Sequence, residues 1–337
     1  MKELFLIIFA SIFLFYFSNI ISKKFNLLDF PNKRKIHFEP IPFTGGLGLI
    51  LSFFFTIWVL HVDYILLNVI FSSFLILCLG VLDDKYKINI GTRIFFQILI
   101  IFFFINTYHI EINYIFKIDN SFKLSLGGFS LIFTLLSVVF FINACNYLDG
   151  IDGLLTIQTI TIFLFFSFLQ FYIHNIINTD LLYLIIPMIV FLFFNFKTFS
   201  LPKLFLGNGG STMLGFNIAF FSIYYGYFYK YLIDPELLIW CLTVVVYEFL
   251  STNLSRFIKN KPLFNPGQDH IQYILLKKYN SVLKANIIIS ISNVFLLGIG
   301  LLSWNFGEIY SVLAYILFFF IYFKIRDKLS KTTIQDN

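Results

Sequence analysis

Two neighbouring carboxylates stand at the end of a long apolar run of this chain. The segment reads Leu82-Asp83-Asp84-Lys85, and adjacent carboxylates repel each other, which a divalent cation relieves. Mg²⁺ prefers one or two protein carboxylates together with substrate phosphates over a site made of protein alone. The pair is therefore a candidate magnesium site, although an isolated Asp-Asp pair is more often part of a solvated loop.

A second group of polar residues follows a later apolar run. Asp149 and Asp152 lie three residues apart among glycines, which permit tight turns and a close approach of the backbone to a ligand. Asn143 and Asn146 lie one helical turn apart at the end of the run, where unpaired polar groups are costly. Helix capping by an aspartate would explain one of these four residues but not all of them.

Three further segments contain candidate residues, and each has an ordinary alternative. Residues 207–211 read Gly-Asn-Gly-Gly-Ser and run into an apolar segment, so their N–H groups could cradle an anion, although glycine-rich turns are common in membrane loops. Arg34 and Lys35 belong to a basic cluster that would also serve as an anchor on the inner side of a membrane. His270 stands in the polar segment 255–283, where a single histidine in a solvated loop usually has no special role.

The elements that carry these residues are apolar runs long enough to cross a membrane. Of 337 residues, 59% are apolar and 12% are charged, against about a quarter charged in soluble domains. We interpret the runs as eleven spans, over residues 4–21, 43–62, 64–82, 92–108, 129–148, 154–173, 180–196, 210–229, 236–254, 284–303 and 306–323. The sequence thus predicts an all-α polytopic membrane protein that forms a single domain over residues 1–337.

The distribution of positive residues indicates how the spans are oriented. With this span count, one set of alternate loops carries 20 of the 24 Lys and Arg residues, and the other set carries 4. Because positive residues favour the cytoplasmic side, we expect the N-terminus outside, the C-terminus inside and all the acidic loops in the cytoplasm. The first run ends without a cleavage-site pattern, so we expect it to remain as a helix.

Composition and spacing argue against several other classes of protein. The three cysteines form no CxxC pair, which disfavours a disulfide framework or a zinc site. The net charge of +6 is spread over the membrane loops, so we expect no nucleic-acid partner. A transporter would carry ionisable residues near mid-span and paired broken helices, whereas these spans are almost free of charge, with Glu248 the main exception.

Taken in order, these segments resemble the polyprenyl-phosphate N-acetylhexosamine-1-phosphate transferase family, of glycosyltransferase 4 type, which contains the WecA-type enzymes and MraY. The resemblance runs from about residue 29 to 273, and the basic first loop favours the WecA-like branch. The matching segments are Pro31-Asn-Lys-Arg-Lys-Ile-His37, Pro42 with Gly45-Gly46, Leu82-Asp83-Asp84, Asn143-Ala-x-Asn146-x-x-Asp149-Gly-Ile-Asp-Gly153 and Phe205-x-Gly-x-x-Gly-Ser211.

The resemblance implies transfer of an N-acetylhexosamine phosphate from a UDP-sugar to undecaprenyl phosphate, with release of UMP. The implied place is the cytoplasmic face of a bacterial inner membrane, and the product would begin a cell-surface polysaccharide such as lipopolysaccharide O-antigen, capsule or teichoic acid. The implied cofactor is Mg²⁺, or Mn²⁺ in its place. The implied residues are Asp83, Asp84 and His270 for catalysis, Asp84 and Asn208 for the metal, and Asn143, Asn146, Asp149, Asp152, Phe205, Arg34 and Lys35 for substrate binding.

The chain departs from the family pattern at three places. Asn208 stands where the family usually has a metal-binding aspartate, and Glu248 stands where many members carry aspartate. Residues 267–273 keep one histidine of a basic family motif, His270, and lack its arginine. A divergent enzyme is favoured because the four loop aspartates are kept together, and a catalytically silent relative that binds polyprenyl phosphate or a partner enzyme stays open. The sequence also leaves open the sugar, the pathway and the oligomeric state, a homodimer included.

Overall fold

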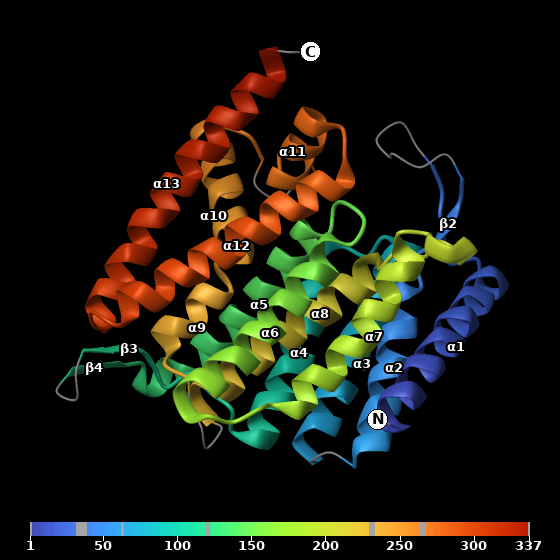
Figure 1. Ribbon diagram of the computed structural model, residues 1–337, viewed down its shortest axis with the longest axis horizontal. Helices are drawn as coiled ribbons and strands as arrows, with labels where there is room; N and C mark the ends of the chain where they lie inside the picture. The colour runs from blue at the N-terminus through green and yellow to red at the C-terminus, as the bar shows by residue number, and fades with distance from the viewer. Residues whose placement is uncertain are drawn as a thin grey trace. The chain divides into compact units, whose positions relative to one another are not determined.

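The computed structural model describes residues 2–31, 39–61, 64–118, 122–228, 233–262 and 267–335, and Figure 1 shows their helices in chain order. The candidate binding residues Arg34 and Lys35 lie outside these residues. The helices are α1 (Lys2–Phe25), α2 (Gly45–Leu60), α3 (Tyr64–Tyr86), α4 (Ile90–Tyr108), α5 (Ser130–Leu148), α6 (Leu154–His174), α7 (Thr179–Asn195), α8 (Gly207–Ile223), α9 (Pro235–Cys241), α10 (Thr243–Ile258), α11 (Ile271–Tyr279), α12 (Val282–Trp304) and α13 (Glu308–Gln335).

Two short antiparallel hairpins accompany the helices of the described residues. One pairs β1 (Leu28–Asp29) with β2 (Ile41–Pro42), and the other pairs β3 (Tyr114–Ile118) with β4 (Phe122–Ser125). Short helical turns lie at η1 (Gly127–Phe129), η2 (Thr198–Ser200) and η3 (Tyr224–Phe228), the last of them a π-helix. Neither hairpin forms a larger sheet, so the predicted all-α class is confirmed.

Each of the eleven predicted spans coincides with a helix, or with the consecutive pair α9 and α10. Among the described residues, seven helices are long and apolar enough to cross a membrane, and the bent pair would make an eighth. The apolar helices α2 and α7 are shorter, with 16 and 17 residues. The chain is therefore a polytopic α-helical membrane protein, while the number eleven stays a prediction.

The helices differ from the predicted spans and loops in three details. The ninth span is not one straight helix, because α9 and α10 meet at an angle of 72°. The last helix does not end near residue 323 but continues to Gln335. The loop between α10 and α12, expected to be polar and solvated, contains α11, whose residues Ile271, Gln272, Ile274 and Leu275 are buried. A short amphipathic helix is not detected by a search for long apolar runs.

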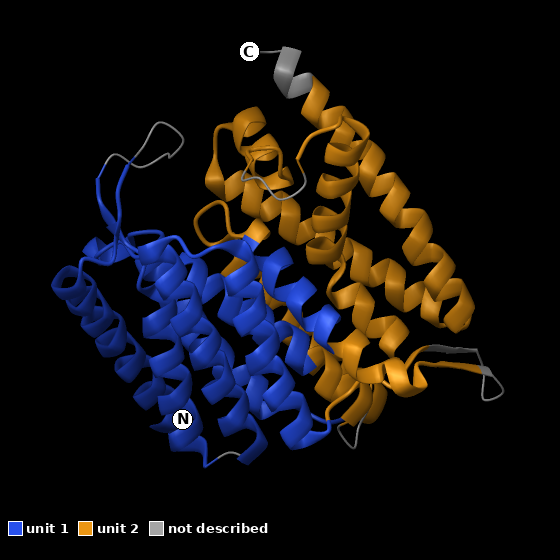
Figure 2. Ribbon diagram, turned by 180° about the vertical axis from the view of Figure 1, so that it is seen from behind, with its two compact units in different colours: residues 1–109, 135–146, 175–221 blue, residues 110–134, 147–174, 222–337 orange. Residues whose placement is uncertain are grey.

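The chain divides into two compact units, each assembled from separate stretches of sequence (Figure 2). Unit 1 comprises residues 1–109, 135–146 and 175–221, and unit 2 comprises residues 110–134, 147–174 and 222–337. α5 contributes residues to both units. The prediction of one domain over the whole chain stays a prediction.

In unit 1, glycines let the first turn of α8 lie directly against two other helices. A Cβ at Gly80 of α3 would lie 2.4 Å from the Cα of Gly209, and one at Gly46 of α2 would lie 2.5 Å from the Cα of Gly210. Small residues of this kind allow helix backbones to approach each other closely in membrane proteins. The end of α3 and the start of α8 are thereby brought together.

In unit 2, α12 packs against α6, α9, α10, α11 and α13. A buried amide pair supports this packing, because Nδ2 of Asn293 donates to Oε1 of Gln158 at 3.0 Å, and Nε2 of Gln158 donates to Ser290 at 3.0 Å. Polar side chains that bond across helices stabilise helix association where no water is present. α12 is therefore the helix around which the other elements of unit 2 are assembled.

Candidate functional site

The adjacent acidic residues Asp83 and Asp84 lie in the last turn of α3 rather than in a loop, so their predicted position is corrected by one helical turn. α3 continues to Tyr86, and the chain reverses at Lys87, which has a φ of 55°. No glycine or proline interrupts residues 81–87, so nothing ends the helix earlier. Carboxylates at the C-terminal end of a helix are disfavoured by its dipole, and they therefore need compensating partners.

Arg93 is the partner of Asp83. Its Nη1 lies 2.9 Å from Oδ2 of Asp83, and the two side chains are 17% and 9% exposed. Arg93 stands in the first turn of α4, which begins where the side chain of Asn89 accepts a hydrogen bond from Gly91 N–H. Nη2 of Arg93 also donates to Oδ1 of Asn143 at 3.4 Å. Three side chains from α3, α4 and α5 are thus linked through one guanidinium.

In the sequence, Arg93 is only one of the 20 Lys and Arg residues on the loops expected in the cytoplasm. Arg93 follows Asp83 by ten residues, and this spacing does not show whether the two side chains lie close together until the helix boundaries are known. The available signal was the short break between α3 and α4, because a tight reversal brings the first turn of α4 beside the last turn of α3. Arg93 is therefore added to the candidate residues.

Asp84 is bound by the start of α8. Its Oδ2 accepts a hydrogen bond of 2.8 Å from the backbone N–H of Asn208. Gly207 has a φ of 77°, and a Cβ there would lie 2.6 Å from the carbonyl oxygen of Phe43 and 3.1 Å from Oδ2 of Asp84. A helix N-terminus favours an anion. The expected anion cradle exists, and the anion at it is a carboxylate of this chain.

Asn208 and Asn146 bond to each other through their side chains. Nδ2 of Asn146 donates to Oδ1 of Asn208 at 3.0 Å and to Oγ of Ser211 at 2.8 Å. The structure therefore brings together in unit 1 five of the predicted site residues, namely Asp83, Asp84, Asn143, Asn146 and Asn208. We call these five residues together with Arg93 the acidic cluster.

The acidic cluster offers oxygen ligands of the kind that Mg²⁺ takes. Asp84 supplies a carboxylate, and an amide oxygen such as Oδ1 of Asn208 has a second lone pair beside the one that accepts from Asn146. Among the described residues, no three His, Cys, Asp or Glu side chains form a group that could hold a metal by themselves. Mg²⁺ commonly completes its shell with water and substrate phosphates, so these residues fit a metal that binds together with its substrate.

Asp149 and Asp152 belong to unit 2, on the short connection between α5 and α6. Gly153 closes this turn with a φ of 76°. Burial raises the pKa of Tyr273, and the charge of Asp149 raises it further, which places the phenol in the field of that carboxylate. A Cβ at Gly150 would lie 2.8 Å from the Tyr273 hydroxyl, so the turn lies directly against α11.

His270 is buried, contrary to the expectation of a solvated loop, with 5% exposure. Its Nδ1 lies 3.3 Å from Oε1 of Glu248. Glu248 also accepts from the hydroxyl of Tyr322 at 2.9 Å and from Nε of Arg326 at 3.3 Å. A carboxylate this deeply buried persists because it is paired and fully hydrogen-bonded. The expectation that Glu248 merely replaces an aspartate misses its contacts with α11 and α13.

Two arginines support the segment before α11, although that segment contains no arginine of its own. Arg256 pairs with Asp269 through Nη2 and Oδ1 at 2.6 Å, and Arg326 donates to the backbone carbonyl of Asp269. Burial raises the pKa of Asp269, but the Arg256 guanidinium outweighs this effect and holds the pKa at about 2. Arg326 is 2% exposed, whereas the sequence suggested only a basic tail.

Phe205 is half-buried in unit 1, and its predicted role in base stacking stays a prediction. Its backbone N–H donates to the carbonyl of Pro42 at 2.8 Å, and its carbonyl accepts from Gly45 N–H at 2.9 Å. Nζ of Lys203 lies 5.3 Å from the ring centroid. The ring is therefore held on a fixed backbone with a cation over its face.

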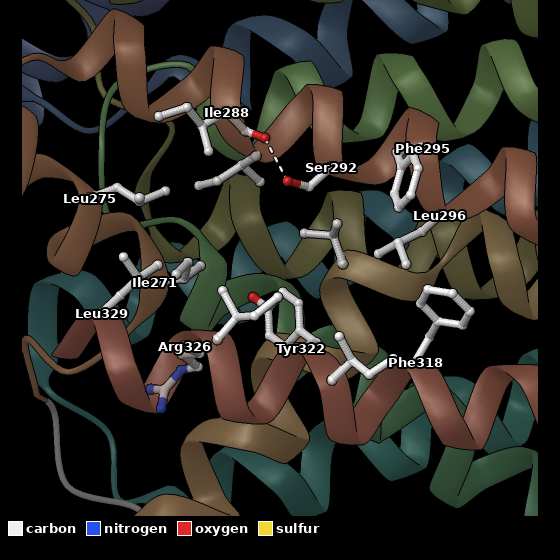
Figure 3. A pocket seen from close by; sticks show the side chains of 14 residues that line it. Ile271, Leu275, Ile288, Ser292, Phe295, Leu296, Phe318, Tyr322, Arg326 and Leu329 are labelled. Carbon is white, nitrogen blue, oxygen red and sulfur yellow. Dashed lines mark hydrogen bonds between the residues drawn. The ribbon is translucent and has the colours of Figure 1, made fainter. Parts of the chain in front are cut away.

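Unit 2 also contains an apolar cavity of about 220 Å³ (Figure 3). Side chains of α10, α11, α12 and α13 line it, among them Leu275, Phe295 and Phe318, while Tyr322 and Arg326 are its largest polar residues. An almost wholly apolar lining matches hydrocarbon and offers little to a nucleotide. The cavity is therefore suited to a lipid chain rather than to a phosphate.

The sequence profile of glycosyl transferase family 4 matches residues 66–226 of this chain. The undecaprenyl-phosphate alpha-N-acetylglucosaminyl 1-phosphate transferase of Escherichia coli K12 is 27% identical over 329 residues, which cover 94% of this chain and 87% of that protein. The probable undecaprenyl-phosphate N-acetylglucosaminyl 1-phosphate transferase of Bacillus subtilis is 24% identical over 259 residues, covering 76% of this chain and 71% of that protein.

Over residues 66–226 the chain is similar to glycosyl transferase family 4. The matched range begins within α3 and ends within η3, so it contains the whole acidic cluster and the turn with Asp149 and Asp152. It does not extend to His270 or to the basic residues Arg34 and Lys35.

Proposed function

We propose that this protein transfers a sugar-1-phosphate, of the N-acetylhexosamine type, from a UDP-sugar to undecaprenyl phosphate and releases UMP. The observation that carries the proposal is the acidic cluster, which lies wholly inside the family match. Its hydrogen bonds form two groups, Asp83 with Arg93 and Asn143, and Asp84 with Asn208 and Asn146, which meet at the adjacent residues Asp83 and Asp84. The matched relatives from Escherichia coli and Bacillus subtilis bear the name of this activity.

In the proposed reaction, a phosphate oxygen of the lipid attacks the β-phosphorus of the UDP-sugar. A new P–O bond forms to the lipid phosphate, and the bond from the β-phosphorus to the bridging oxygen breaks, so UMP leaves with that oxygen. Asp83 accepts a proton from the lipid phosphate or orients it, and Arg93 supplies positive charge beside it. Asp149 and Asp152 bind the nucleotide, and His270 contacts the pyrophosphate.

Several phosphate oxygens meet in this reaction and need screening. We assign Asp84 and Asn208 as the residues that hold Mg²⁺, which when bound would neutralise charge on the phosphate oxygens. The hydrogen bond from Nδ2 of Asn146 to Oδ1 of Asn208 fixes the orientation of the Asn208 amide. The start of α8 fixes Asp84 through Asn208 N–H, so the ligand is held before the substrates arrive.

We further propose that the chain crosses a bacterial inner membrane eleven times, with its N-terminus outside and its C-terminus in the cytoplasm. Support comes from the agreement between the eleven apolar runs and the helices, and from the fivefold excess of Lys and Arg on one set of loops. This orientation places α3's last turn, and with it Asp83 and Asp84, at the cytoplasmic side, where nucleotide sugars are found.

The test is turnover by purified protein in detergent or lipid nanodiscs. The protein is incubated with undecaprenyl phosphate, Mg²⁺ and a panel of UDP-sugars, while UMP release and lipid products are followed by mass spectrometry. Asp84→Asn should reduce the rate by about 10² or more, whereas Asp180→Asn, in the first turn of α7, should not. If no UDP-sugar is turned over although undecaprenyl phosphate binds, the silent-relative alternative replaces the enzyme.

A further inference from the structure

The connection between α5 and α6 is a turn of five residues that carries both Asp149 and Asp152. Two backbone hydrogen bonds lie within the turn. Gly150 N–H donates to the carbonyl of Leu148 at 2.8 Å, and Leu154 N–H donates to that of Ile151 at 3.3 Å. Side chains of α11 and α12 add further bonds at both ends of the turn.

Gln272 of α11 bonds the helix end that leads into this turn. Its Nε2 donates to the carbonyl of Tyr147 at 2.9 Å and to that of Leu148 at 3.3 Å. These belong to the last carbonyls of α5, which have no partner within their own helix. Because only the NH₂ end of an amide can donate to a carbonyl, the two contacts fix the orientation of the side chain.

The side chain of Gln272 is buried, and within the described part of the chain only its donor end, Nε2, makes hydrogen bonds. The side chain is 0% exposed, and its Oε1 has no hydrogen-bond partner among the described residues. An unsatisfied buried acceptor is costly, so an amide is not an efficient way to fill space here. Retaining it makes physical sense if the two bonds from Nε2 are needed.

Asn286 of α12 bonds the other end of the turn. Its Nδ2 donates to the carbonyl of Asp152 at 2.9 Å, and the residue is 2% exposed. Both amides thus bind backbone carbonyls, and neither of these bonds uses a carboxylate of the turn. The turn is held at its two ends by neutral donors from different helices.

α11 is in turn fixed by the buried carboxylate of unit 2. Ile271 N–H donates to Oε1 of Glu248 at 3.0 Å, and Gln272 is the next residue. A Cβ at Gly150 would lie 2.9 Å from Nε2 of Gln272, so the amide lies in direct contact with the turn. The backbone beside Gln272 is therefore held by Glu248, and the absence of a side chain at Gly150 lets the amide of Gln272 contact the turn.

We propose that Gln272 is a positioning residue, which fixes Asp149 and Asp152 in the geometry that binds the nucleotide part of the UDP-sugar. This inference rests on the proposed transferase function, in which these two aspartates bind the nucleotide. Gln272 acts through the carbonyls of α5, while Asn286 restrains the far end. Loss of the amide lets the turn relax, and a shift of about 1 Å at a binding group can cost on the order of a hundredfold.

The decisive variant is Gln272→Met, which keeps the length of the side chain and removes its donors. We expect KM for the UDP-sugar to rise about tenfold or more, while KM for undecaprenyl phosphate stays within about twofold. The matched control is Gln158→Met, which removes another buried amide of unit 2 that bonds Ser290 and Asn293 and not the turn. Both KM values of the control should stay close to those of the unaltered protein.

A second measurement does not need activity. Hydrogen–deuterium exchange of peptides covering residues 147–153 should be faster in Gln272→Met and in Asn286→Leu than in Gln158→Met. Unchanged exchange, or a KM for the UDP-sugar that rises equally in Gln158→Met, overturns the inference. If the unaltered protein releases no UMP, the proposed transferase function fails, and the exchange measurement still decides whether Gln272 fixes the turn.

Discussion

Replacing Arg93 by methionine removes the one guanidinium that joins Asp83 to Asn143. The Nη1–Oδ2 distance is 2.9 Å and both side chains are mostly buried, so this is a charged hydrogen bond worth about 1.5–3 kcal/mol. Coulomb's law at an effective dielectric constant of about 20 gives about 4 kcal/mol for two unit charges about 4 Å apart, which is an upper limit for the pair. The bond to Asn143 is longer, at 3.4 Å, and adds little.

If Arg93 acts through Asp83, a loss of about 2 kcal/mol lowers kcat/KM roughly 30-fold. Lys85→Met removes the same charge from a neighbouring exposed residue and should change kcat/KM by less than about threefold. In the double variant Asp83→Asn with Arg93→Met, the two losses should not add, because they remove one interaction. UMP release at varied lipid concentration is the assay. An Arg93→Met enzyme with nearly normal kcat/KM, or one whose loss equals that of Lys85→Met, refutes the assignment.

Three further predictions concern the metal, acid stability and topology. Asn208→Asp restores a carboxylate that can still accept from Asn146, so half-maximal UMP release should need several-fold less Mg²⁺, and a lower rate at every Mg²⁺ concentration would contradict this. The pKa of Asp269 is about 2, below its ordinary value of about 3.9, so its contribution to stability is complete above about pH 4 and is lost as the pH falls toward 2. Arg256→Gln should lower the thermal midpoint at pH 7 and reduce the part of the acid-induced loss that comes from Asp269; an unchanged profile of midpoint against pH would count against the pair. After the native cysteines are replaced, an impermeant maleimide should label Ser125→Cys and not Asn260→Cys in intact cells, and the reverse pattern would overturn the orientation.

The helices could be predicted from the sequence, because the backbone of a long apolar run in a membrane must satisfy its own hydrogen bonds, which a helix does. The sequence is also sufficient for the residue types of the acidic cluster, since the motifs alone indicate Asp83, Asp84, Asn146 and Asn208. It was not sufficient for Arg93 and Arg326, whose charge looked like an ordinary cytoplasmic excess. Only three-dimensional packing shows that Arg326 is 2% exposed and bonded to Glu248.

Two other features could not be predicted for a different reason. The 72° bend between α9 and α10 lies at Leu242, with no proline or glycine in the run to predict it, so tertiary packing decides the break. α11 is short and amphipathic, and its buried face can be identified only from its contacts with α12 and α13. The sequence marks Gln268 and Gln272 only as departures from the family motif at residues 267–273 and leaves open whether they, with Asn208, reduce or abolish activity, because the contacts of Gln272 depend on the packing of α11.

The glycine contacts between α3, α2 and α8 have a consequence for how natural variation in this protein is read. Gly80 and Gly46 contact Gly209 and Gly210 backbone to backbone, and these contacts set where Asn208 meets Asp84. A genetic screen for inactive alleles should therefore recover alanine at Gly80 or Gly46 alongside changes of the aspartates. Such alleles would look like lesions in the chemistry although neither glycine has a side chain with which to bind a substrate. These glycines should therefore not be counted as catalytic residues, because they act by setting the distance between helices and not by taking part in the reaction.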